Sequence, residues 1–246
     1  MQKESCSNSP KVFYEKACAI VRLFGEVNNQ TIFELCDEID LAIDYYNYRK
    51  IEIQIDSPGG SIQSLDYFIT KLEKWRQKEG VIIATLGLTN VASAAAMILA
   101  LGTVGYRRAY RSSSLLFHNS RVITNGSSVF TKETLNKANK DLAEIDERLL
   151  DRLSNHIHSN KVIQNDKVVH KKMWGLQFDV EKKSYQEYEL SEESAGVSVI
   201  TLKKEYVKLH NLDVYISPGL AGKMLLIDFY QEDFESKGFE KRFKED

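Results

Sequence analysis

The chain of 246 residues carries 33 basic and 35 acidic side chains, a formal net charge of −2, and 43% of its residues are apolar. The near-neutral charge argues against nucleic-acid binding, which needs a clustered basic face. The apolar share is ordinary for a globular protein of one large domain, so we expect a single domain over residues 1–246.

Cysteine usage and hydropathy indicate where the protein resides. The three cysteines, Cys6, Cys18 and Cys36, form no CxxC pair, which favours a reducing compartment. Residues 1–10 are polar and lack the apolar core of a signal peptide. The longest apolar run, residues 91–101, is shorter than the about 20 residues that a membrane-spanning helix needs. We expect a soluble, cytoplasmic protein that binds no membrane.

The first half of the chain alternates between strand-like and helix-like patterns. Thr31, with Glu34 three residues on, is expected to cap the first helix as a capping box. Such alternation predicts an α/β fold with a parallel sheet and right-handed crossovers. The strands are expected at residues 17–24, 51–55, 81–86, 109–110 and 115–117, and the helices at 31–46 and from 62 to near Gly80.

The second half begins with a long helix at residues 131–156, whose stripe of apolar residues from Leu135 to Leu153 requires a partner surface, either on its own domain or on another subunit. Residues 157–200 lose this stripe, and a helical pattern returns at residues 201–211. We interpret residues 157–200 as an insertion and residues 229–246 as a charged tail.

The alanine-rich segment at residues 91–96 contains one serine, Ser93, directly after the strand expected at residues 81–86. A serine in the first turn of a helix lies beside unpaired N–H groups and the positive end of the helix dipole. Both favour an oxyanion that forms next to a serine nucleophile. Plain helix packing is the alternative reading of such a serine.

Two further segments carry possible chemistry. The Asp-Ser-Pro-Gly-Gly sequence at residues 56–60 follows a buried strand, and its glycines permit close backbone approach. It is either a tight strand-to-helix turn or a loop whose N–H groups face a substrate. His118 follows the strand at residues 115–117, where it is either structural or the base that a serine nucleophile needs. Open parallel sheets place their ligand and active sites at the carboxyl ends of their strands, where we expect both Ser93 and His118.

These three segments resemble, in order, those of the proteolytic subunit of the Clp protease. Residues 55–60 resemble its strand that ends in N-S-P-G-G, residues 87–102 its serine segment, and residues 112–118 its N-S-x-x-M-I-H strand. The separation from Ser93 to His118, 118 − 93 = 25, also matches. The resemblance implies a ClpP/crotonase-type spiral core of repeated β-β-α units, with a long handle helix and an insertion before the last core segment.

The same resemblance implies a serine endopeptidase that needs no metal or cofactor. A Ser-His-Asp triad would hydrolyse peptide bonds of unfolded proteins or peptides inside an oligomeric chamber. The chamber would be formed by one homo-oligomeric ring or by two such rings stacked on each other. An AAA+ unfoldase would be its partner. The N–H groups of Gly60 and Ala94 would form the oxyanion hole. A head-maturation protease of a phage or prophage, and a catalytically silent scaffold subunit, are the alternatives.

The triad acid is expected late in the chain. The segment from Asp213 to Asp228 resembles the family's D-R-F-L-S-A…L-V-D segment, whose first aspartate belongs to the triad. We therefore predict Asp213, with Asp166 and Asp179 as alternatives. The chain departs from the family where Ala94-Ala95 replaces Met-Gly and where Asn119-Ser120 follows His118. His156, His158 and His170 lack ordered acidic or thiol partners, so we expect solvated histidines and no metal site.

Overall fold

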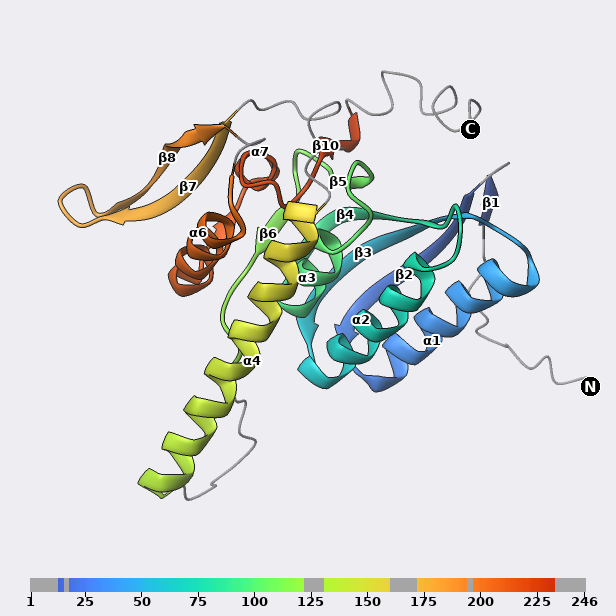
Figure 1. Cartoon of the computed structure of the whole chain (residues 1–246), viewed down its shortest axis with the longest axis horizontal. Coiled ribbons are helices and arrows are strands. Elements are labelled where there is room, and N and C mark those ends of the chain that lie inside the picture. Colours follow the sequence, from blue (N-terminus) through green and yellow to red (C-terminus); the bar gives the residue numbers. More distant parts are fainter. Residues whose placement is uncertain (1–12, 16–17, 122–130, 160–171, 194–196, 233–246) are drawn as a thin grey trace, which may run out of the picture.

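The computed structural model describes residues 13–15, 18–121, 131–159, 172–193 and 197–232 (Figure 1). Its main sheet has the strand order β1-β2-β3-β4-β5-β10. Every pairing along this path is parallel except that of β1 with β2. The predicted parallel α/β architecture is therefore confirmed. The strands are Phe13–Glu15 (β1), Cys18–Val27 (β2), Lys50–Gly60 (β3), Ile82–Ala92 (β4), Arg107–Ala109 (β5) and Phe229–Tyr230 (β10).

A short branch leaves this sheet at the end of β4. There β4 pairs in parallel with β6 (Ser114–Leu116), and β6 pairs antiparallel with β9 (Tyr215–Ile216). Strand β4 can serve both β5 and β6 because it uses different residues for each, 85–87 for the first and 90–92 for the second. The branch brings a segment from late in the chain beside the start of the alanine-rich helix.

Strands β3 and β4 are longer than predicted. Strand β3 continues through the Asp-Ser-Pro-Gly-Gly segment to Gly60, and β4 continues to Ala92, the residue before Ser93. Alternation ends at Ile55, but pairing with β2 continues to Gly60 beyond a register shift. Backbone pairing with neighbouring strands, rather than side-chain pattern, sets where these strands end.

Helices cover the sheet as the alternating pattern predicts. In Figure 1, α1 and α2 lie side by side over β2 and β3, while α4 and α6 lie beside each other near β6. The helices are Asn29–Asp40 (α1), Ile62–Arg76 (α2), Ala94–Ala100 (α3), Lys132–Ser159 (α4), Val199–Leu212 (α6) and Pro218–Lys223 (α7), with a π-helical turn at Leu41–Tyr45.

The cap of α1 differs from the prediction. Asn28 is the N-cap, and its side chain accepts a hydrogen bond from the backbone N–H of Thr31 at 3.0 Å. The Thr31 hydroxyl in turn accepts from the backbone N–H of Asn28 at 3.0 Å. Thr31 therefore fills the position that we expected for Glu34, because a threonine hydroxyl can close the reciprocal capping pair as a carboxylate does.

The stripe on α4 divides into two parts. Leu149 and Leu153 are buried in the domain, whereas Leu135 remains 48% exposed on the half of the helix that projects away from the sheet (Figure 1). The helix continues past residue 156 to Ser159, and Ile157 is buried. The C-terminal half of the stripe thus has its partner surface within its own domain, whereas Leu135 does not.

The predicted insertion includes an ordered hairpin. Strands β7 (Lys172–Asp179) and β8 (Ser184–Glu193) pair antiparallel in a separate two-stranded sheet. The buried carboxylate of Glu205 on α6 accepts hydrogen bonds from Tyr188 of the hairpin and from Lys208. This polar contact fixes the hairpin to α6. Helix α6 begins at Val199, with Ser198 as its N-cap, rather than at residue 201 as predicted.

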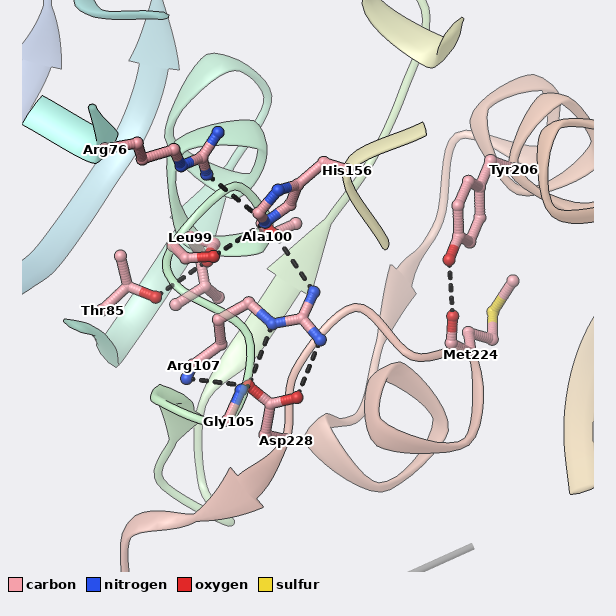
Figure 2. Close-up of polar contacts among 11 residues, drawn as sticks. Arg76, Thr85, Leu99, Ala100, Gly105, Arg107, His156, Tyr206, Met224 and Asp228 are labelled. Carbon is pink, nitrogen blue, oxygen red and sulfur yellow. Dashed lines mark hydrogen bonds and ion pairs between the residues drawn. The ribbon is translucent and has the colours of Figure 1, made fainter. Parts of the chain in front are cut away.

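The predicted tail at residues 229–246 also begins inside the fold, since β10 joins the sheet. Of this tail, the structure describes residues 229–232. Asp228, just before β10, is buried and paired with the guanidinium of Arg107, with an Nη2–Oδ1 distance of 2.8 Å (Figure 2). Its Oδ2 also accepts from the backbone N–H of Gly105 and of Arg107. A buried carboxylate with this many donors is a fixed anchor for the end of the domain.

Candidate functional site

Ser93 lies at the turn between β4 and α3, where it is the N-cap residue rather than a member of the first helical turn. Its backbone has φ 56° and ψ −127°, a conformation that residues other than glycine rarely adopt. The backbone N–H of Ser93 donates to the carbonyl of Leu116 on β6 at 2.8 Å. This hydrogen bond fixes the turn to the neighbouring strand, and Ser93 lies at the end of β4.

Gly59 contacts this turn from the side of β3. A Cβ atom at Gly59 would lie 2.5 Å from both the Cβ of Ser93 and the carbonyl oxygen of Ala92, and its φ is +88°. Only glycine fits there, so the glycine pair is explained by close backbone approach. The same Cβ position lies 2.9 Å from the backbone nitrogen of Ala94. The two predicted oxyanion donors, Gly60 and Ala94, thus belong to segments that meet beside Ser93.

Strand pairing brings the segments that carry the three predicted triad residues side by side. Ala92, the last residue of β4, pairs with Leu116, the last residue of β6; Ser93 directly follows β4, and His118 lies two positions after Leu116. Leu116 also pairs with Tyr215 of β9 in the antiparallel direction. Asp213 lies two positions before Tyr215, outside the paired residues and with φ 53°.

The side chains of this site make other contacts in the described conformation. Nδ1 of His118 lies 2.6 Å from the carbonyl oxygen of Asn119, its own neighbour. Asp213, the C-cap of α6 with φ 53°, forms an ion pair with Arg121. Among the described residues, no hydrogen bond joins Ser93 to His118 or His118 to Asp213. The assignment of these three residues as a triad stays a prediction.

The alternative acids differ in how they fit. Asp166 lies outside the described residues. Asp179 ends strand β7, and its Oδ1 accepts hydrogen bonds from the backbone N–H groups of Glu181 and Lys182 at 3.0 Å. Its carboxylate therefore shapes the turn between β7 and β8, which lies apart from β6 in Figure 1.

Two residues that the sequence analysis did not single out support the segment around His118. His210 on α6 is 6% exposed, and its ring centroid lies 6.1 Å from that of Phe117. Burial lowers the pKa of His210 to about 4, so the ring is neutral at pH 7. Asp146 on α4 accepts from the backbone N–H of Ser120 at 2.9 Å and from its hydroxyl at 2.6 Å. Only three-dimensional proximity reveals these residues, because neither is near His118 in sequence.

The histidine prediction for α4 was wrong for His156. Its Nε2 lies 2.9 Å from the carbonyl oxygen of Gly102 and beside Arg76, not in solvent (Figure 2). Burial and the positive charges of Arg76 and Arg107 lower the pKa of His156 to about 3. His170 lies outside the described residues. Within the ranges that the structure describes, no three His, Cys, Asp or Glu side chains are grouped to hold a metal ion.

The parallel sheet, the handle helix α4 and the serine turn together define a mixed α/β protein of the ClpP fold. The family model described as Clp protease matches residues 2–173, well over half of the chain, and the chain belongs to this family. That match includes Ser93 and His118 but ends before Asp213. No helix in the described part of the chain is long and apolar enough to cross a membrane.

Two curated relatives come from Frankia casuarinae. The ATP-dependent Clp protease proteolytic subunit 3 is 41% identical over 70 residues, which cover 28% of this chain and 31% of the relative. Proteolytic subunit 2 is also 41% identical over 70 residues, which cover 28% of this chain and 30% of the relative. The chain thus matches less than a third of the length of these relatives.

Proposed function

We propose that this protein is a Clp-type serine endopeptidase, with Ser93 as nucleophile, His118 as general base and Asp213 as the acid that orients it. The observation that carries the proposal is the pairing of β4 with β6 and of β6 with β9, because the three residues lie one or two positions beyond the paired strand ends. A serine at positive φ beside a glycine that admits no Cβ adds support, since strained turns of this kind occur at functional sites.

The chemistry is acyl transfer. The Ser93 hydroxyl attacks the peptide carbonyl while His118 takes its proton, and His118 then gives that proton to the leaving amine. Water releases the acyl group by the same route in reverse. Asp213, once it faces His118, fixes the imidazole tautomer and stabilises its protonated form. The N–H groups of Gly60 and Ala94 would bind the oxyanion, and losing one such donor typically costs about 100- to 1,000-fold in rate.

We propose further that the protein acts as an oligomer of identical chains that encloses the sites and receives unfolded chains from an AAA+ unfoldase. The relatives are named as subunits of an ATP-dependent protease. The N-terminal half of α4 supports assembly, because it projects from the domain with Leu135 exposed (Figure 1). The reducing, cytoplasmic location expected above fits the buried thiols of Cys18 and Cys36.

Hydrolysis of a fluorogenic peptide by matched aspartate variants tests the site. We expect Asp213→Asn to lower kcat by roughly 10⁴-fold, the effect of losing the orienting acid in a serine protease triad. Asp179→Asn, which alters only a hairpin turn, should stay within a few-fold of wild type. The reverse ranking, or full activity in Ser93→Ala, would exclude the assignment.

A catalytically silent scaffold subunit is the second candidate. The contacts of His118 with Asn119 and of Asp213 with Arg121 favour it, because both take up atoms that a working triad uses. This candidate predicts that the wild-type assembly neither hydrolyses peptides nor reacts with a fluorophosphonate at Ser93. Labelling at Ser93 would exclude it.

A further inference from the structure

The three residues that follow His118 are each bound to a different side chain from a later part of the fold. Nδ2 of Asn119 donates to Oδ1 of Asn211 at 2.6 Å. Ser120 donates to Asp146 on α4 with both its backbone N–H and its hydroxyl. The Arg121 guanidinium pairs with the Asp213 carboxylate. The segment is therefore fastened at every residue, and its last contact is with the proposed triad acid.

This last contact involves the carboxylate that the proposed catalysis requires. Leu116 pairs with Tyr215, so the segment with His118 and Arg121 follows the strand beside that of the Asp213 carboxylate. In the described conformation Arg121 holds it, and Nδ1 of His118 is left with the carbonyl of Asn119. A histidine without its acid lacks the orientation and charge stabilisation that a triad provides.

We propose that the Arg121–Asp213 ion pair is an autoinhibitory contact, in which Arg121 competes with His118 for the triad acid. The inference rests on the proposed function, since it assigns regulation to that same site. Activation then consists of one exchange of partners. Arg121 moves into solvent and releases the Asp213 carboxylate, and the His118 ring rotates from the Asn119 carbonyl to that carboxylate.

The exposure of the pair sets the size of the effect. The Arg121 side chain is 56% exposed and that of Asp213 is 49% exposed, so water and salt screen their attraction. An exposed ion pair of this kind shifts a conformational equilibrium by about two- to five-fold, equivalent to about 0.4–1 kcal/mol. The contact thus reduces activity without abolishing it, and assembly or substrate binding suffices to displace it.

The test compares peptide hydrolysis by wild type, Arg121→Gln and Arg121→Lys at low and high ionic strength. Arg121→Gln removes the charge, so we expect it to be about two- to five-fold faster than wild type in 20 mM salt. Salt should accelerate wild type but not Arg121→Gln, because only wild type has an ion pair to screen. Arg121→Lys keeps the charge and should retain the salt response. Lys172→Gln removes a similarly exposed ion pair, that with Glu189 on the hairpin, and should behave as wild type.

Each outcome separates this inference from the function on which it depends. If wild type and Arg121→Gln hydrolyse the peptide at equal rates with equal salt responses, the autoinhibitory role is wrong and the peptidase assignment stands. If Arg121→Gln is slower, Arg121 instead supports the active site, and the inference is again wrong. If neither protein hydrolyses peptide or labels at Ser93, both proposals fail. In the Asp213→Asn background, Arg121→Gln should give no gain over Asp213→Asn alone, because the effect acts through Asp213.

Discussion

The backbone contact between Gly59 and Ser93 is the tightest constraint on the site. Any side chain at Gly59 would overlap the Cβ of Ser93 and the carbonyl of Ala92. Since Ser93 itself has φ 56° and is bound to Leu116, the turn has little freedom to yield. The position of the serine hydroxyl therefore depends on the absence of one methyl group on the neighbouring strand.

Gly59→Ala should accordingly abolish peptide hydrolysis and lower the free energy of unfolding by about 1–3 kcal/mol, the usual cost of overpacking. Urea denaturation and a peptide assay measure both effects. Gly80→Ala is the matched control, because Gly80 also has positive φ but nothing lies within 4 Å of its Cβ position. That variant carries backbone strain alone and should keep its activity. Equal effects of the two variants would show that close packing at Gly59 is unimportant.

The glycine pair, Ser93 and His118 could be proposed as site residues from sequence because short motifs with local chemistry carry them. It could not find Arg121 as the partner of Asp213, nor Asp146 and His210 around His118. These contacts join segments that are up to 92 residues apart in sequence, as for Asn119 and Asn211. Nothing in a local pattern specifies such pairs, so they require the fold.

At the scale of elements, His156 links α4 to α2 and to the turn that follows α3. The His156 ring contacts the carbonyl of Gly102 and lies close to Arg76, which itself donates to the carbonyl of Leu101. Its pKa falls from 6.5 to about 3 on folding, so protonation favours the unfolded chain. The contribution of His156 to stability is thus complete above pH 6.5 and is lost as pH falls from 6.5 towards 3.

We expect the wild-type free energy of unfolding to fall between pH 7.5 and pH 5.5, with His156 contributing about 1 kcal/mol of the loss. His210 acts in the same direction, because its pKa is also lowered, to about 4. His156→Gln keeps a donor for Gly102 but does not titrate, so it should lose about 1 kcal/mol less over this range. Urea denaturation at the two pH values measures the difference. Equal losses in both proteins would contradict the burial of His156.

Elements with a clear period were predicted well. The buried face of α1, with Ile32, Leu35 and Ile39, is the one that the sequence indicates. The hairpin of β7 and β8 was missed, because β8 is rich in charged residues and β7 has no regular apolar alternation. Its strands pair with each other, Met173 and Leu176 of β7 are buried in the core, and Tyr188 contacts Glu205, but none of these leaves a periodic signal.

For the whole molecule, the projecting half of α4 is the feature that a single chain leaves unexplained. Leu149 and Leu153 are covered by the domain, but Leu135 is exposed on a helix that extends beyond it (Figure 1). Burying one leucine side chain contributes roughly 1.5–3 kcal/mol. In a ring the same contact would form once in each subunit, so these contributions would add up over the assembly.

Leu135→Glu should therefore reduce the mass of the assembly in light scattering by separating stacked rings, while the far-ultraviolet circular dichroism of the chain stays unchanged. Lys137→Glu, a charge change on the same exposed turn, is the control and should leave the mass as it is. An unchanged mass for Leu135→Glu would remove α4 from the proposed contact between rings.

The most direct test of the account is the site of reaction with a fluorophosphonate, read by peptide mass spectrometry. We predict a single adduct on Ser93 in wild type, and its loss when His118 is replaced by alanine, because the imidazole must activate the hydroxyl. An adduct on another serine, or equal labelling of Ser93 without His118, would contradict the account.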